Sequence, residues 1–232
     1  LTAFTDKDNS ITSETLQSWQ VNKDIDGFYT SIGSRAFLGC SSLASVVIPD
    51  SVTSIGDKAF YGCSSLDSVI IPNGVTRILT STFDRCTSLD SVVIPDSVES
   101  IGEQAFHACS SLVSVVIPDS VKIIELYAFA HCSSLAEVVI PDSLESIDEG
   151  TFQSCSSLNN VVIPDSVSIS AEAFANCGCD EKIYRPGVTM CNCHYVEDST
   201  CFEKLSTTTA RTARTTTSQV LIKKIEINLD TN

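Results

Sequence analysis

Cysteine is the residue type in this 232-residue chain whose spacing most directly suggests chemistry. Eleven cysteines are present, and four of them gather near the carboxyl end: Cys179, Cys191, Cys193 and Cys201. An even-numbered cluster in a segment without a core is typical of disulfides, which form in oxidising compartments. Zinc and free thiols are the alternatives, but a Cys-x-Cys spacing is shorter than the Cys-x2–4-Cys spacing common in zinc sites. We therefore expect disulfides, in a pairing that the sequence leaves open, and no metal ion.

The other seven cysteines form a column, because each follows a phenylalanine by three residues in a sequence that repeats every 23 residues. They are Cys40, Cys63, Cys86, Cys109, Cys132, Cys155 and Cys177. In stacked strands about 4.8 Å apart, such side chains point in parallel, with Cβ atoms farther apart than the roughly 3.8 Å that a disulfide prefers. We expect small, buried residues with reduced thiols.

Histidine is the residue type best suited to acid–base catalysis. His107 and His131 follow their phenylalanines by one and two residues, and His194 lies among the carboxyl-terminal cysteines. The different repeat positions predict that no two histidines act together. The chain also lacks a nucleophile elbow, a phosphate-binding glycine loop and an HExxH motif. The sequence therefore predicts a protein that is not an enzyme and has no cofactor.

The elements that carry these residues are set by the repeat, which is marked by six prolines 23 residues apart: Pro49, Pro72, Pro95, Pro118, Pro141 and Pro164. Residues 89–94 have the spacing Leu-x-x-Val-x-Ile, which predicts a short strand with Val92 and Ile94 facing inward. Pro95 ends the strand because it cannot donate a ladder hydrogen bond. A second extended piece at residues 98–101 is followed by at most one helical or 3₁₀ turn, which carries Phe106 inward.

Such periodicity predicts a leucine-rich repeat solenoid, a right-handed coil with a parallel β-sheet, short helical or 3₁₀ turns and about seven repeats. Single coils bury too little apolar surface to fold alone, so both ends of the stack need covers. We expect a degenerate repeat acting as a cap at residues 1–30 and the solenoid at residues 31–177. A cysteine-rich cap at residues 178–205 and a threonine-rich linker and tail at residues 206–232 follow.

Two columns of the predicted strands should face away from the core and are the candidate binding residues. One is β-branched: Val47, Ile70, Val93, Val116, Val139 and Val162. The other is polar, with Ser68, Ser91, Ser114 and Glu137 as the candidates. A continuous exposed β-branched row is a candidate binding or self-association surface. The alternative is that these strand-forming residues pack on one another along the ladder.

A further column places Asp50, Asp96, Asp119, Asp142 and Asp165 directly after the prolines. Stacked carboxylates could attract a cation such as calcium. We favour a structural role, because aspartate is a common turn residue that bonds to its own backbone.

Net charge excludes two classes of partner. The formal charge is −15 with only 14 basic residues, which argues against nucleic acid and against an anionic membrane surface. No stretch is long and apolar enough to span a bilayer. The chain begins with Leu1 and shows no signal peptide, so we expect a processed or excised fragment.

The repeated sequence resembles that of BspA-like leucine-rich repeat proteins. The shared run is Leu-x-Ser-Val-Val-Ile-Pro-Asp-Ser-Val-x-Ser-Ile-Gly-x-x-Ala-Phe-x-x-Cys-Ser-Ser, over about residues 31–177. The resemblance implies a right-handed solenoid in a cell-surface or secreted protein that adheres to proteins or to other cells, without catalytic residues. We therefore expect an extracellular or surface module that binds a protein or glycoprotein. The alternative is an intracellular scaffold or a self-associating structural element.

Overall fold

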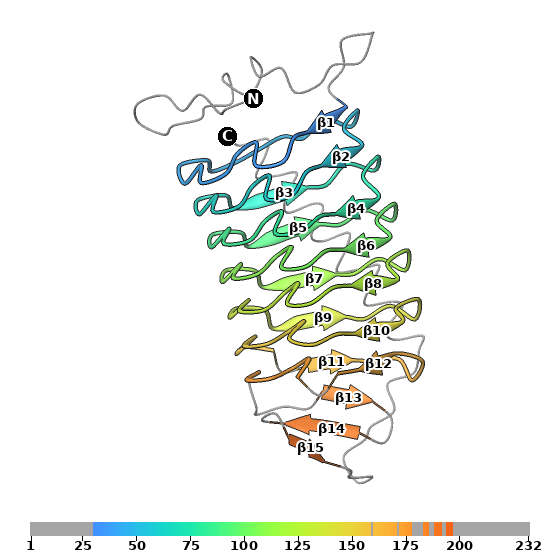
Figure 1. Ribbon diagram of the computed structural model, residues 1–232. Coiled ribbons are helices and arrows are strands. Elements are labelled where there is room, and N and C mark those ends of the chain that lie inside the picture. Colours follow the sequence, from blue (N-terminus) through green and yellow to red (C-terminus); the bar gives the residue numbers. More distant parts are fainter. Residues whose placement is uncertain are drawn as a thin grey trace.

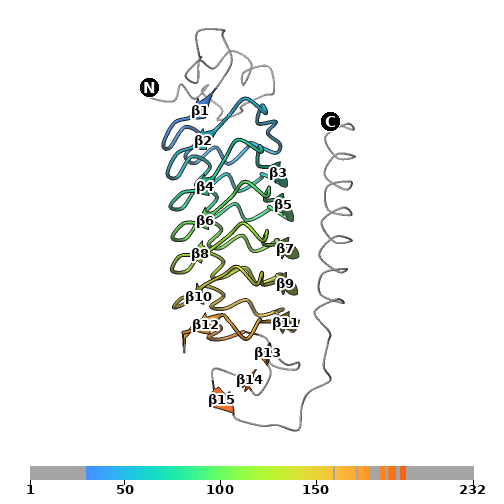
Figure 2. The same ribbon diagram turned by 90° about the vertical axis from the view of Figure 1, so that its right-hand side faces the viewer.

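Each coil contributes two short strands, and stacking aligns them in two rows, which we call ladders (Figure 1). Hydrogen-bonded pairing is interrupted within each row, so the described strands form five separate sheets. The computed structural model of the protein describes residues 30–158, 160–170 and 172–177, together with the backbone of three further strands at 183–185, 188–191 and 194–196. About six turns of a parallel β-solenoid result. Figure 2 shows the two ladders on opposite sides of the stack.

The first ladder is formed by the strands that precede the prolines. Its members are β3 (Ser68–Ile70), β5 (Ser91–Val93), β7 (Ser114–Val116), β9 (Glu137–Val139) and β11 (Asn160–Val162). Partners lie 23 residues apart, as in Ser68 opposite Ser91. Val92 and Ile94 are buried as predicted. We call the outer surface of this ladder the sheet face.

The second ladder follows the proline turn. Its strands are β1 (Ser31–Ile32), β2 (Ser54–Ile55), β4 (Arg77–Ile78), β6 (Ser100–Ile101), β8 (Ile123–Ile124), β10 (Ser146–Ile147) and β12 (Ser168–Ile169). Between the ladders, each proline carbonyl accepts the N–H group three residues on, as from Val98 to Pro95 at 3.1 Å. The aspartates after the prolines are exposed in these turns, and their structural role stays a prediction.

The first ladder continues past Cys177 into the segment expected to be the carboxyl-terminal cap. Strand β13 (Ile183–Arg185) pairs in parallel with β11, with Ile183 opposite Val161. Strands β14 (Val188–Cys191) and β15 (His194–Val196) then add in antiparallel order. The parallel ladder is thereby joined to a hairpin. The remaining residues of the expected caps and tail lie outside the described part of the chain.

The core is a stack of identical layers. Seven phenylalanine rings lie face to face along the axis, with centroids 5.0–5.6 Å apart and interplanar angles of 3–11°. Aromatic pairs of this kind add about 0.5–1.5 kcal/mol beyond the area they bury. Since each inner ring has a neighbour above and below, the stability of a coil comes from its neighbours.

The expected helical or 3₁₀ turn before each cysteine is wrong, because the described residues contain no helix. The N–H groups of Arg35, Phe37 and Gly39 donate to carbonyls of the next coil, at 2.9, 2.7 and 2.7 Å. The residues between them donate three residues back within their own coil. Arg35 and Gly39 also adopt left-handed φ angles of 61° and 71°. A helix needs every N–H group for itself and a negative φ throughout, so alternating turns form instead.

Candidate interaction surface

The β-branched row lies on the sheet face in the predicted register, but its exposure is uneven. Val47 is 71% exposed, whereas Ile70, Val93 and Val116 are half-buried and Val139 is buried. The side chain of Val162 lies outside the described residues. Ile70 stands directly opposite Val93. The row is therefore only partly exposed at Ile70, Val93 and Val116, and the expectation of exposure is wrong at Val139, because side chains at ladder spacing cover one another.

The polar column beside it is partly buried. Ser68 and Ser91 are 2% and 1% exposed, so the prediction that they face solvent is wrong. Each serine is short, and Ser68 lies between Ser45 and Ser91 of the coils on either side. The hydroxyl of Ser68 donates to the carboxylate of Asp67 at 3.1 Å, and that of Ser91 to Asp90 at 2.6 Å. Ser114 is half-buried and Glu137 is exposed.

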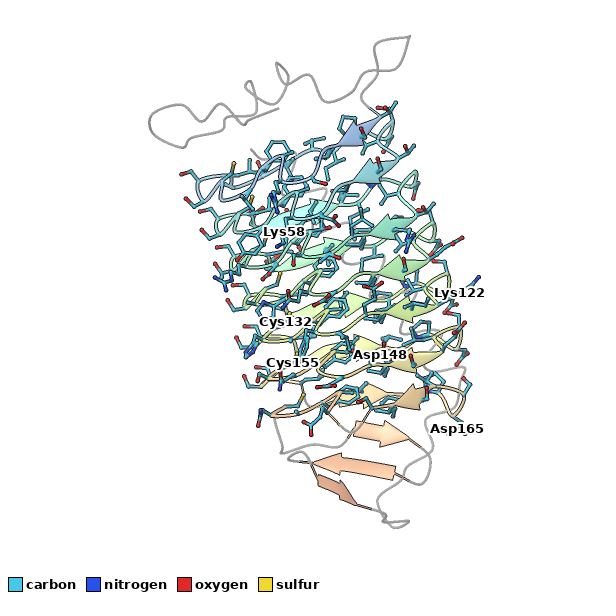
Figure 3. The ribbon with its side chains drawn as sticks, viewed as in Figure 1. Lys58, Lys122, Cys132, Asp148, Cys155 and Asp165 are labelled. Atoms are coloured by element: carbon cyan, nitrogen blue, oxygen red, sulfur yellow. The ribbon has the colours of Figure 1, made fainter. Side chains whose placement is uncertain are left out.

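The cysteine column is buried, as predicted, and its members are free thiols. Each thiol after the first donates to the carbonyl of a phenylalanine in the preceding coil, as from Cys132 to Phe106 at 3.2 Å. Cys132 and Cys155 lie in successive coils near one edge of the stack (Figure 3). Burial raises the pKa of Cys63 and Cys132 to about 12. The thiolate, which is the reactive form, is therefore disfavoured from Cys40 to Cys155.

The carboxyl-terminal cysteines are untested as disulfide partners. Cys179, Cys193 and Cys201 lie outside the described residues, and Cys191 is described only by its backbone, which pairs with His194 in the β14–β15 hairpin. Disulfides there remain a prediction. Among the described residues, no group of three or more His, Cys, Asp or Glu side chains is arranged to hold a metal ion.

That no two histidines act together stays a prediction, but two of them do lie in contact. The rings of His107 and His131 meet edge to face, with centroids 5.3 Å apart. His107 Nδ1 also lies 2.9 Å from Oδ1 of the buried Asp84. The two histidines are 24 residues apart, which is one coil plus one residue and makes them diagonal neighbours. That spacing could have revealed the pair from sequence.

Sequence reasoning also missed an aromatic and basic group on the same edge. Lys58 Nζ lies 6.0 Å from the centroid of the Tyr61 ring, and Arg85 Cζ lies 5.7 Å from it. Cations at such distances are attracted to the ring face. These residues occupy repeat positions that differ from coil to coil, and this variation is the signal that could have found them.

Stacked 23-residue coils with strands ahead of a proline turn, and aromatic and thiol columns behind it, define a leucine-rich repeat solenoid. The family model for the BspA type leucine rich repeat region matches residues 10–97 and 76–208, in six copies. The chain belongs to this family. Members of the family generally act as binding modules rather than enzymes, in protein interaction or as repeat scaffolds.

Solved bacterial structures share the fold. A leucine rich repeat protein of T. pallidum is 38% identical with a TM-score of 0.64, over 67% of this chain and 73% of that one. One from Bacteroides ovatus is 34% identical with a TM-score of 0.57, over 68% and 44% of the two chains. One from Eubacterium ventriosum is 25% identical with a TM-score of 0.58, over 67% and 45%. The match thus spans less than half of the last two proteins.

Among curated proteins, none matches the chain. Within the part of the chain that the structure describes, no helix has the length and apolar character needed to cross a membrane.

Proposed function

We propose that the chain is a non-enzymatic cell-surface or secreted module that binds proteins or glycoproteins through its sheet face. The observation that carries this proposal is the β-branched row, which begins at the exposed Val47 and continues through the half-buried Ile70, Val93 and Val116. The row crosses successive coils of a rigid scaffold in a chain of high negative charge. An uncharged strip on such a scaffold is a suitable contact surface, because little side-chain freedom is lost on binding.

The second candidate is an intracellular scaffold or a self-associating structural element. The seven free thiols are compatible with it, because reducing compartments keep cysteines in this form, but ladder geometry also keeps them apart in an oxidising compartment. Alkylation before and after reduction, mapped by mass spectrometry, separates the two. Disulfides among Cys179, Cys191, Cys193 and Cys201 support the extracellular module. Eleven free thiols, or stoichiometric zinc, place the protein in the cell and overturn the proposed localisation.

The sheet face is tested by the double substitution Val93→Glu and Val116→Glu, which adds two charges to the row. Binding is measured on an array of immobilised matrix proteins and glycans, with circular dichroism to check the fold. The control is Thr53→Glu with Thr76→Glu, which adds the same charge at exposed positions where other coils carry Glu99 and Glu145. We expect loss of binding only in the first variant.

Because Val93 and Val116 are half-buried, Val47→Glu is measured in parallel at the most exposed position of the row. We expect weaker binding from this variant too. If both sheet-face variants fold and bind as the wild type does, the sheet face is not the binding surface.

A further inference from the structure

The coil that contains β8 departs from the repeat at consecutive surface positions. Three other coils read Ser-Ile-Gly, at residues 31–33, 54–56 and 100–102, where this coil reads Ile-Ile-Glu at residues 123–125. Leu126 then follows in a column that holds Glu103 and Glu149 in the adjacent coils. Ile123 is 48% exposed and Leu126 is 42% exposed. Packing of the core explains neither residue, because Ile124 already fills the inward position.

A tyrosine beside these residues is held in place by a glycine of the next coil. The Cβ atom of any other residue at Gly150 would strike the Tyr127 ring, so the ring lies directly against the backbone there. The Tyr127 hydroxyl also donates to Glu149 Oε1 at 3.4 Å. Gly150 has a left-handed φ of 64°, at a position where Lys58, Gln104 and Tyr127 itself adopt the same conformation in other coils. The aromatic side chain is thus positioned before any partner arrives.

Carboxylates surround this group. Glu103 and Glu149 flank Leu126 along the stack. Backbone hydrogen bonds link the three coils here: the N–H group of Gln104, next to Glu103, donates to the Leu126 carbonyl, and the N–H group of Tyr127 donates to the Glu149 carbonyl. Glu125 follows Ile124 and holds the N–H group of Glu103 through Oε2 at 3.0 Å. Glu149 is also the main cause of a raised pKa at the Tyr127 hydroxyl. Lys122 lies at the outer edge of the coil, in the column between Glu99 and Glu145 (Figure 3).

From this arrangement we propose that Ile123, Leu126 and Tyr127, the β8 patch, bind a protein segment that presents a large apolar side chain beside lysine or arginine residues. The apolar centre takes the apolar side chain, and the carboxylates of Glu103, Glu125 and Glu149 attract the cations. The same carboxylates repel phosphate and sulfate, which argues against nucleic acid and sulfated sugars. The proposal rests on the proposed function, since it treats the chain as an interaction module. It concerns the side opposite the sheet face (Figure 2).

The test uses 12-residue synthetic peptides with one central leucine or phenylalanine, flanked by four lysines, four serines or four glutamates. Fluorescence polarisation gives Kd values for the whole chain and for two variants, Ile123→Ser with Leu126→Glu and Leu126→Glu alone. Both place residues at these positions that other coils carry there, so the fold should be kept. The matched control is Val113→Asp, which removes a 51% exposed apolar side chain and places there the aspartate that the two preceding coils carry as Asp67 and Asp90.

We expect lysine peptides to bind the wild type about tenfold more tightly than serine peptides, and both β8-patch variants to lose about tenfold in affinity. Val113→Asp should bind as the wild type does. Non-specific attraction by net charge predicts the opposite sign, because Leu126→Glu and Val113→Asp each add one negative charge and would both tighten binding.

The proposal is overturned if the wild type binds no lysine peptide, if serine peptides bind as tightly, or if the folded β8-patch variants keep their affinity. The Val93→Glu, Val116→Glu variant should bind the lysine peptides unchanged. If that variant loses array binding while the β8-patch variants bind the peptides unchanged, the β8-patch proposal is wrong and the sheet-face proposal stands. If that variant keeps array binding while the β8-patch variants lose peptide binding, the sheet-face proposal is wrong and the β8-patch proposal stands.

Discussion

The interior and the exterior of the coils follow opposite rules. Inside, the phenylalanine column is the same residue seven times, and its rings are nearly parallel at 5.0–5.6 Å. At the surface, the position two residues after it varies between coils, as in Arg85, Ala108 and His131. An inward side chain must match the layers above and below, whereas an outward one meets mainly water. Repetition therefore builds the scaffold, and departures from it carry recognition.

The largest expected effect in the interior is a loss of stability at alkaline pH. Unfolded thiols ionise near their ordinary pKa of 9.0, whereas burial raises the pKa of Cys63 and Cys132 to about 12. The unfolded state then binds fewer protons, so the free energy of unfolding falls as pH rises above 9. The slope should be about 1.4 kcal/mol per pH unit for each buried thiol. Urea unfolding at several pH values measures it.

Cys109→Ala removes one of these thiols and should make that slope shallower by about 1.4 kcal/mol per pH unit. The thiol is fully buried and its pKa is raised by burial above all. An unchanged slope, or rapid alkylation of the native column at pH 9, would show that the column is open to water.

Ring stacking is tested by truncating one ring at a time. Phe106→Ala should cost about 3–5 kcal/mol in the free energy of unfolding, because it leaves a cavity between two stacked rings. Urea unfolding measures this cost. A cost below about 1 kcal/mol would mean that contact between coils is not what stabilises the column.

The exterior is tested by a smaller change at Gly150. Gly150→Ala should destabilise by about 1–2 kcal/mol for the left-handed φ, with a further cost for contact with Tyr127. Gly62→Ala is the matched control, because its φ is 72° but a Cβ there would meet no atom closer than 3.7 Å. In a protein that also carries Tyr127→Ala, the two glycine substitutions should destabilise equally. If Gly150→Ala still costs more there, Tyr127 is not held by Gly150.

The sequence predicted the features of the fold that repeat. Inward residues such as Val92, Phe106 and Cys109 were identified correctly, because residues at the same repeat position take the same orientation in every coil. The helical turn was wrong because sequence does not show that alternate N–H groups donate to the next coil. Ser68 was expected to face solvent from strand alternation and is buried, because alternation says nothing of how far neighbouring coils cover a short side chain.

The candidate sites were harder to predict, because they depend on contacts between coils. Reading down a column finds residues 23 apart, whereas His107 and His131 meet across 24. Tyr127 and Gly150 do share a column, yet only backbone geometry shows that the missing Cβ makes room for the ring. Departures from the repeat, as at Ile123 and Leu126, were visible in the sequence and were the signal to follow.

The thiol of Cys86 donates to the carbonyl of Phe60, and that of Cys109 to Phe83. Each interface between coils repeats the same bonds. In a chain lacking residues 64–86, the Cys109 thiol could therefore donate to the Phe60 carbonyl, and the Phe60 ring could stack on the Phe106 ring. The length of this protein can thus change in steps of one coil. Such a step would shift the distance between surface groups on different coils while leaving each group intact.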